Sequence, residues 1–146
     1  MRRIETSIDI GAPAERVWSI LTDFDAFPRW NPFISEISGT PEAGEHLSVH
    51  IQPPGGRAMT FHPEVLEANA PHLLRWLGRL GIKGIFDGEH RWQIESLAGD
   101  RSRFLHSETF SGLLVPILGS MLSKTEAGFR EMNEALKQRA ESENEN

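Results

Sequence analysis

The sequence predicts an α+β fold: a curved antiparallel sheet of seven strands wraps around one long C-terminal helix, with two short helices after the first strand. Three observations predict it. The first segment alternates in polarity, six further short segments with strand character are separated by turn sequences, and the C-terminal segment repeats its apolar residues every three or four positions. The chain has 146 residues, which suits one domain with its own core.

The N-terminal segment predicts one strand followed by two short helices. Gly11 ends the strand, and Pro13 lies where the first turn of a helix accepts proline. The second helix is expected to be short because Pro28 and Pro32 both lie in its segment. The strand itself is predicted because Ile4, Thr6, Ile8 and Ile10 alternate with Glu5, Ser7 and Asp9.

Six further strands are predicted, and the segments between them carry residues that favour turns. Short strands joined by short turns favour an antiparallel meander. In the third of the six, two sets could face inward, Phe61, Pro63 and Val65 or His62, Glu64 and Leu66, and the first is favoured because it is apolar throughout. The six segments are Phe33–Ser38, His46–Gln52, Met59–Ala68, Leu73–Leu80, Glu89–Leu97 and Arg103–Ser111.

The C-terminal segment predicts one long amphipathic helix that covers the sheet. Pro116 fits only in its first turn, and from there to Arg139 the helix would be roughly 35 Å long. Residues 1–139 are expected to form the domain, and the acidic residues 140–146 a disordered tail. The apolar stripe consists of Leu114, Leu118, Met121, Leu122, Thr125, Phe129, Met132 and Leu136.

Composition excludes several classes of function. The chain has no cysteine, so a disulfide framework, a thiolate metal site and a cysteine nucleophile are excluded. The net charge of −6 does not favour nucleic-acid binding. The longest apolar segment, residues 113–122, is too short to span a bilayer, and residues 1–10 do not form a signal peptide. We therefore expect a cytoplasmic protein without a membrane span.

Four segments carry a resemblance to a known family: Ile8–Trp18, Trp30–Phe33, Phe86–His90 and Glu108–Pro116. They are similar to the START/Bet v 1-like (SRPBCC) superfamily, in its polyketide cyclase/dehydrase-like branch, and the resemblance extends from Ile4 to about Leu136. It implies the helix-grip fold. It also implies the binding of a hydrophobic molecule such as a sterol, lipid, hormone, quinone or polyketide. Some members cyclise polyketides, with acid and base residues that differ between subfamilies.

The last two predicted strands place polar residues on an inward face. A hairpin centred on residues 98–101 pairs Ile94 with Phe104, Trp92 with His106, and His90 with Glu108. Because side chains alternate, all six lie on one face of the sheet, which is the more aromatic one. Two imidazoles and a carboxylate are therefore expected to point towards the terminal helix.

Four interpretations of His90, His106 and Glu108 are open, because buried polar groups need partners. They can simply bond to one another, or they can form the polar end of a ligand cavity. His106 or Glu108 can instead act as a general base beside a ligand carbonyl. The residue types also fit a site with two histidines and one carboxylate for a metal, but nothing in the sequence shows that the three side chains converge on one point.

Apolar residues that could contact the body of a ligand come from several elements. Trp76, on the neighbouring strand, suits the core or a ligand platform. Trp30, in an aromatic-rich segment, suits a plug of the sheet or a hydrophobic entrance. Trp92 and Phe104 from the hairpin, with Met121, Leu122 and Phe129 from the terminal helix, complete the expected ligand-binding set.

We expect a non-catalytic protein that binds a small hydrophobic ligand between the sheet and the C-terminal helix, as a monomer or homodimer without a metal or cofactor. The alternative is an enzyme of the polyketide cyclase or dehydratase type, with His106 or Glu108 as the acid or base. A third class is a partner-binding module. Its contact surface would be the glycine-rich connection at residues 79–88, which is a lid or a hairpin tip, with Ile82, Ile85 and Phe86 expected to be exposed.

Overall fold

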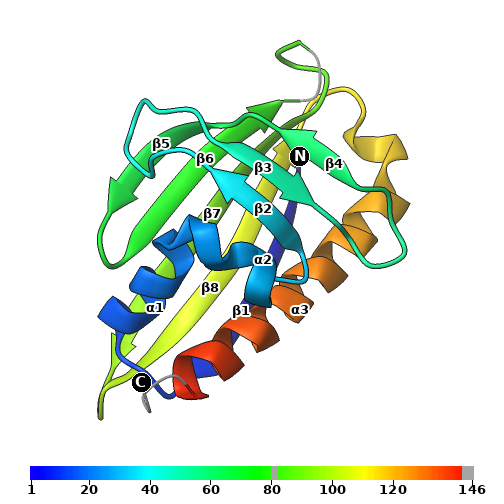
Figure 1. Cartoon of the computed structure of the whole chain (residues 1–146). Helices are drawn as coiled ribbons and strands as arrows, with labels where there is room; N and C mark the ends of the chain where they lie inside the picture. Colours follow the sequence, from blue (N-terminus) through cyan, green and yellow to red (C-terminus); the bar gives the residue numbers. More distant parts are fainter. Residues whose placement is uncertain (80–81, 143–146) are drawn as a thin grey trace.

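A five-stranded antiparallel sheet forms the larger wall of the molecule (Figure 1). The computed structural model describes residues 1–79 and 82–142. The first strand of the chain, β1 (Arg2–Ile10), pairs with the last strand, β8 (Arg101–Ser111). In spatial order the strands are β1 (Arg2–Ile10), β8 (Arg101–Ser111), β7 (Asp87–Leu97), β6 (Leu73–Arg79) and β5 (Glu64–Asn69). Leu80, predicted to end β6, lies outside the described residues.

A second, three-stranded sheet forms the opposite wall and corrects the predicted strand count. It contains β2 (Ile34–Ser38), β3 (Ser48–Ile51) and β4 (Met59–Phe61). The predicted strand Met59–Ala68 is two strands, β4 and β5, so the described residues form eight strands rather than seven. The break falls at Pro63, which has no N–H to donate to a ladder. The two sheets stay connected because the Leu47 N–H donates to the Pro63 carbonyl.

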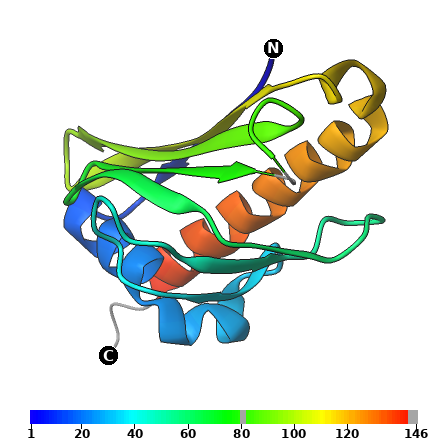
Figure 2. The ribbon, with the colours of Figure 1, turned by 90° about the horizontal axis from the view of Figure 1, so that it is seen from above.

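The helices cover the space between the two sheets. The short ones after β1 are α1 (Ala14–Thr22), a 3₁₀ turn (Phe24–Ala26) and α2 (Phe27–Trp30). A second 3₁₀ turn (Val115–Ile117) precedes α3 (Gly119–Ser142). Figure 2 shows α3 lying between the larger and the smaller sheet. Pro116 lies in the 3₁₀ turn, so the long helix begins three residues later than its sequence suggests.

The predicted register of the β7–β8 hairpin is confirmed. His90 pairs with Glu108, Trp92 with His106, and Ile94 with Phe104. All of these except Glu108 are buried, whereas the alternating residues, such as Arg91 and Gln93, are partly exposed. The aromatic face of the hairpin therefore points inward.

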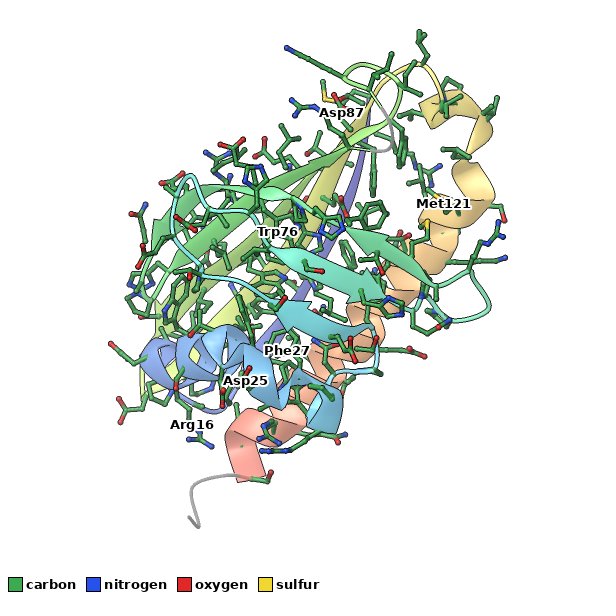
Figure 3. All side chains as sticks on the ribbon, turned by 45° about the horizontal axis from the view of Figure 1, so that its top comes forward. Arg16, Asp25, Phe27, Trp76, Asp87 and Met121 are labelled. Carbon is green, nitrogen blue, oxygen red and sulfur yellow. The ribbon has the colours of Figure 1, made fainter. Side chains whose placement is uncertain are left out.

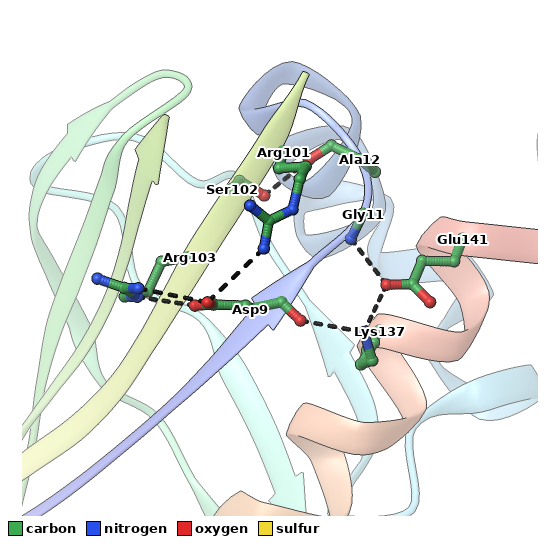
Figure 4. Close-up of polar contacts among 8 residues, drawn as sticks. All are labelled: Asp9, Gly11, Ala12, Arg101, Ser102, Arg103, Lys137 and Glu141. Atoms are coloured by element: carbon green, nitrogen blue, oxygen red, sulfur yellow. Dashed lines mark hydrogen bonds and ion pairs between the residues drawn. The ribbon is translucent and has the colours of Figure 1, made fainter. Parts of the chain in front are cut away.

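The end of α3 is attached to the end of β1, which corrects the predicted boundary of the tail. Residues 140–142, expected to be disordered, belong to the helix. The Gly11 N–H donates to Oε2 of Glu141 at 2.7 Å, and the Lys137 ammonium bonds both that carboxylate and the Asp9 carbonyl (Figure 4). The Asp9 carboxylate accepts from Arg103 at 2.7 Å. Residues 143–146 of the predicted tail lie outside the described residues.

In the middle of α3, the backbone at Gly128 lies directly against the ring of Phe33. Gly128 is buried, and a Cβ placed on it would overlap the ring of Phe33. Phe33 is fully buried and packs edge-to-face on Phe129, with ring centroids 5.6 Å apart. Gly128 therefore sets how closely α3 can lie against the smaller sheet. At Gly119, by contrast, a Cβ would meet only the end of the Arg2 side chain, at 3.5 Å.

We predict opposite effects for the same substitution at these two glycines. Gly128→Ala should lower the free energy of unfolding by about 1–3 kcal/mol, because overpacking outweighs the helix propensity of alanine. Gly119→Ala should leave it unchanged or raise it by up to about 1 kcal/mol. Urea denaturation of both variants measures this, and equal effects at the two positions would contradict the close approach of Phe33.

Candidate functional site

A cavity of about 70 Å³ lies between the sheets and α3. Its walls are mostly apolar, and Figure 3 shows Trp76 on β6 and Met121 on α3 among them. Two larger hollows, of about 290 and 240 Å³, are lined by more polar side chains. The cavity is lined by Phe33, Ile34, Val49, Ile51, Met59, Phe61, Pro63, Trp76, Gly78, Arg79, Phe86, Gly88, His90, Glu108, Phe110, Met121 and Thr125.

Four of the ten ligand-binding residues expected from the sequence lie in this wall: Trp76, His90, Glu108 and Met121. The other six, which do not line it, are Trp30, Trp92, Phe104, His106, Leu122 and Phe129. For Trp30 and Trp92 the reason is the position of α2, whose Phe27 ring lies 5.2 Å from the ring of Trp30 and 6.4 Å from that of Trp92. His106 and Phe129 instead stack on each other, with ring centroids 3.9 Å apart. These aromatic rings pack that end of the interior, and the cavity is confined to the other end.

A continuous chain of hydrogen bonds leads from the cavity wall into the core. Glu108 Oε1 lies 3.2 Å from Nδ1 of His90, whose Nε2 lies 2.9 Å from Nε2 of His106. Nδ1 of His106 lies 2.9 Å from Oδ1 of Asn133 on α3. The Asn133 amide donates to Oγ1 of Thr6 on β1, and the Thr6 hydroxyl donates to the His106 carbonyl, both at 2.9 Å. Three strands and the helix therefore meet in one polar network.

The direction of each hydrogen bond follows from this order. The Thr6 hydroxyl donates its proton to the His106 carbonyl, so its Oγ1 can only accept a hydrogen bond from Asn133. The amide nitrogen of Asn133 therefore faces Thr6, and its Oδ1 faces His106. His106 therefore carries its proton on Nδ1, and its Nε2 accepts from Nε2 of His90. The remaining contact, between His90 Nδ1 and Glu108, then requires one shared proton. Whichever residue holds that proton, the pair has no net charge.

His106 is held in its neutral form. Burial away from water holds its pKa well below the ordinary value of 6.5, and the nearby charge of a protonated His90 acts in the same direction. The hydrogen bond to Asn133 opposes the shift and is the smaller influence. A neutral His106 is the state that the network needs, because only then can its Nε2 accept a hydrogen bond from the Nε2–H of His90.

Packing fixes the two polar groups that lie in the cavity wall. The His90 ring stacks on Trp76, with centroids 4.7 Å apart and planes 11° from parallel. The Glu108 carboxylate lies over Gly88 of the neighbouring strand, where a Cβ would overlap its Oε2. Glycine at position 88 therefore leaves the space that the carboxylate occupies.

The alternative of a metal held by two histidines and a carboxylate does not fit this geometry. The Nε2 atoms of His90 and His106 form a hydrogen bond with each other, and Nδ1 of His90 forms one with Glu108, so these nitrogens do not have lone pairs directed at a common metal position. Within residues 1–79 and 82–142, no group of three or more histidine, aspartate or glutamate side chains is placed to hold a metal ion.

One residue of the glycine-rich connection differs from its prediction. Phe86, expected to be exposed, is buried and stacks on Phe110 with centroids 5.5 Å apart. Both rings line the cavity. Ile85 is partly exposed, and Ile82 is exposed as expected. Gly81, in the same connection, lies outside the described residues.

Asn133 and Thr6 are members of the network that the sequence analysis did not single out. Both positions carried a signal. Asn133 follows Phe129 by four residues, on the apolar stripe of the helix, and Thr6 lies on the inward side of the first strand. A polar residue at an inward position predicts a buried partner, but it does not say which one.

We predict that acid destabilises the fold through His106. Its pKa is lowered in the folded state, so below about pH 6.5 the unfolded chain binds a proton that the folded protein does not. The free energy of unfolding should fall with decreasing pH by up to about 1.4 kcal/mol per pH unit from this group. His106→Asn should make the slope shallower in urea titrations from about pH 7 to pH 5. The exposed His62→Asn is the matched control, and an unchanged slope in His106→Asn would contradict the assignment.

Comparison of the sequence and structure with those of known proteins identifies the family and the fold of the chain. No curated protein matches the chain. A START superfamily protein from Mycobacterium smegmatis is similar over 95% of this chain and 97% of its own, at 24% identity and a TM-score of 0.73. An aromatase/cyclase from a Streptomyces species (17% identity, TM-score 0.76) covers 96% and 93% of the two chains. A norcoclaurine synthase from Thalictrum flavum (13% identity, TM-score 0.74) covers 99% and 96%.

These similarities establish the helix-grip START-like fold that the sequence resemblance implied. Among the described helices, none combines the length and apolar character needed to cross a membrane. A family model described as polyketide cyclase/dehydrase and lipid transport matches residues 1–141. The chain therefore belongs to the polyketide cyclase/dehydrase and lipid transport family.

Proposed function

We propose that the protein binds a small, neutral, hydrophobic molecule with one hydroxyl or carbonyl group in the cavity between the sheets and α3. One observation carries the proposal: an apolar cavity has the hydrogen-bonded pair of His90 and Glu108 in its wall. Apolar walls favour an apolar body, and a few fixed polar groups orient a ligand and select its polar end. The description of the family to which the chain belongs names polyketides and lipids, which are largely hydrophobic molecules.

The charge of the wall favours a neutral ligand over a carboxylate. The pair of His90 and Glu108 shares one proton and has no net charge. Arg79, at the edge of the cavity, has Asp87 as a counter-charge, 3.8 Å away. A carboxylate brought into this cavity would lose water without gaining an unpaired cation, which is costly. A hydroxyl can donate to Glu108 at no such cost.

The size of the cavity favours a small ligand or one that displaces flexible side chains. About 70 Å³ is less than the roughly 300–1,000 Å³ of cavities that hold drug-sized molecules. Met59 on β4 and Met121 on α3 both line the cavity and are only partly buried. Because methionine side chains rotate easily, we expect these two to move when a ligand with more than one ring enters.

We predict that phenol binds and that benzoate, which has a similar ring but a negative charge, binds at least about tenfold more weakly. Glu108→Gln should weaken phenol binding by about tenfold or more, because an amide cannot share a proton with His90 and is a weaker acceptor for the hydroxyl than a carboxyl group paired with His90. Chemical-shift titration by NMR measures both affinities and identifies the site through the side chains in the cavity wall.

The matched control is Glu89→Gln, on the outward face of the same hairpin, where Glu89 is paired with Arg75. This variant should bind phenol as the unchanged protein does. Equal or tighter binding of benzoate would refute the neutral-ligand proposal. Phenol shifts confined to residues outside the cavity would refute the site.

An enzymatic role is the second candidate, and the proton shared by His90 and Glu108 favours it. The Glu108 carboxylate could remove a proton from a carbon between two carbonyl groups. The electron pair of the C–H bond would move onto a carbonyl oxygen to form an enolate, and the proton would return from Glu108 or from water. Such a step begins the ring closure or dehydration of a poly-carbonyl chain.

For this candidate we predict faster exchange of the central protons of acetylacetone with deuterated water when the protein is present. Glu108→Gln should lower the protein-dependent rate by about a hundredfold, the contribution typical of a general base. Proton NMR follows the exchange directly, and Glu89→Gln again provides the control. A rate that does not exceed that of buffer, or that survives in Glu108→Gln, would exclude the enzymatic role for this carboxylate.

A further inference from the structure

Three large apolar side chains are exposed at one end of the molecule. They are Ile82, Leu113 and Ile117, with 73%, 77% and 75% of their surfaces exposed. Ile82 belongs to the connection between β6 and β7, and the other two precede α3. We call these three residues the entrance patch.

Backbone hydrogen bonds hold the two segments of the entrance patch side by side. The Leu113 N–H donates to the Gly84 carbonyl at 3.1 Å, and the Leu114 N–H donates to the Ile85 carbonyl at 3.0 Å. The neighbouring Ile117 lies in the 3₁₀ turn that these contacts anchor. The exposed side chains therefore project from one supported surface rather than from separate loops.

The entrance patch lies beside the cavity. Phe86, Phe110 and Met121 line the cavity, and each lies within four residues of a member of the patch. Phe86 and Phe110 stack on each other, and they lie four residues after Ile82 and three residues before Leu113, respectively, in the sequence. A molecule that entered between these rings and the first turn of α3 would pass this end of the protein.

Three exposed basic side chains lie on the segments that carry the entrance patch or on elements next to them, although the protein as a whole has a charge of −6. Lys83 follows Ile82, the end of the Arg2 side chain reaches Gly119, and Lys124 lies in the second turn of α3; all three are exposed. No ion pair joins any of these three to a carboxylate in the described part of the chain. The nearby acids are neutralised: Asp87 by Arg79, and Glu126 by Arg130.

We propose that the entrance patch docks on the surface of an anionic lipid bilayer, with Ile82, Leu113 and Ile117 inserted among the lipids and Arg2, Lys83 and Lys124 at the phosphate groups. Exposed apolar side chains beside cations suit the boundary between headgroups and acyl chains. Docking in this orientation turns the Phe86 side of the cavity towards the membrane. A hydrophobic ligand could then pass between bilayer and cavity without crossing water.

The same features disfavour two other occupants. A second copy would bring two basic surfaces together, and like charges oppose that contact. A protein partner with an apolar ridge would need a groove, whereas these three side chains protrude. Docking is also independent of which ligand the cavity holds, so a failure of the proposed function would leave this proposal standing.

The test is co-sedimentation with vesicles of phosphatidylcholine alone or mixed with phosphatidylglycerol. The unchanged protein should sediment with the anionic vesicles, at least about tenfold more strongly than with the neutral ones, and added salt should release it. Leu113→Ser combined with Ile117→Ser, and separately Lys83→Glu combined with Lys124→Glu, should each weaken binding by about tenfold or more.

The charge-matched control is Arg29→Glu combined with Arg101→Glu, two exposed residues in α2 and at the tip of the β7–β8 hairpin. It should bind the anionic vesicles nearly as the unchanged protein does. Thermal melting verifies that each variant is folded. No binding to anionic vesicles, equal binding to both vesicle types, or an equal loss in the control would overturn the proposal. A concentration-dependent dimer that Leu113→Ser/Ile117→Ser abolishes would instead assign the patch to a second copy.

Discussion

Two imidazoles can lie in an apolar interior only if each ring nitrogen has a hydrogen-bond partner, and the arrangement of this protein depends on that requirement. The Nε2 atoms of His90 and His106 are each other's hydrogen-bond partners, which leaves the two Nδ1 atoms to be satisfied. Glu108 supplies the outer partner, and Asn133 supplies the inner one. Because Asn133 is also bonded to Thr6, the network fixes α3 against β1 and β8 in one rotation, as the ordinary packing of apolar side chains would not.

The same network gives the interior its polarity. At its inner end the protons are fixed, since Asn133 and Thr6 determine which nitrogen of His106 accepts. At its outer end one proton is shared between His90 and Glu108, in the wall of the cavity. The buried network therefore presents a neutral pair that can both donate and accept, which is useful for recognising a hydroxyl or carbonyl and for moving a proton.

The two ends of the long helix have different chemistry. At its C-terminal end, Lys137 and Glu141 attach α3 to the end of β1, and α2 fills the nearby interior with aromatic rings. At its N-terminal end, glycine and a 3₁₀ turn begin the helix beside the cavity and the exposed apolar residues. Aromatic rings fill the interior near the C-terminal end of α3, and the cavity lies near its N-terminal end. This arrangement suits a protein that takes up a ligand from one side.

The sequence by itself determined the order of elements, the β7–β8 register and the inward direction of His90, His106 and Glu108, because alternation and turn residues are local properties. It missed the split at Pro63, although the missing N–H of proline is a local signal, and it missed the helical residues 140–142, which contacts with the end of β1 hold in place. Only the tertiary structure decided that Asn133 and Thr6 complete the network, and that Phe27 confines the cavity away from Trp92. Spacing shows which face a side chain occupies, but the partner on that face is set by how remote elements pack.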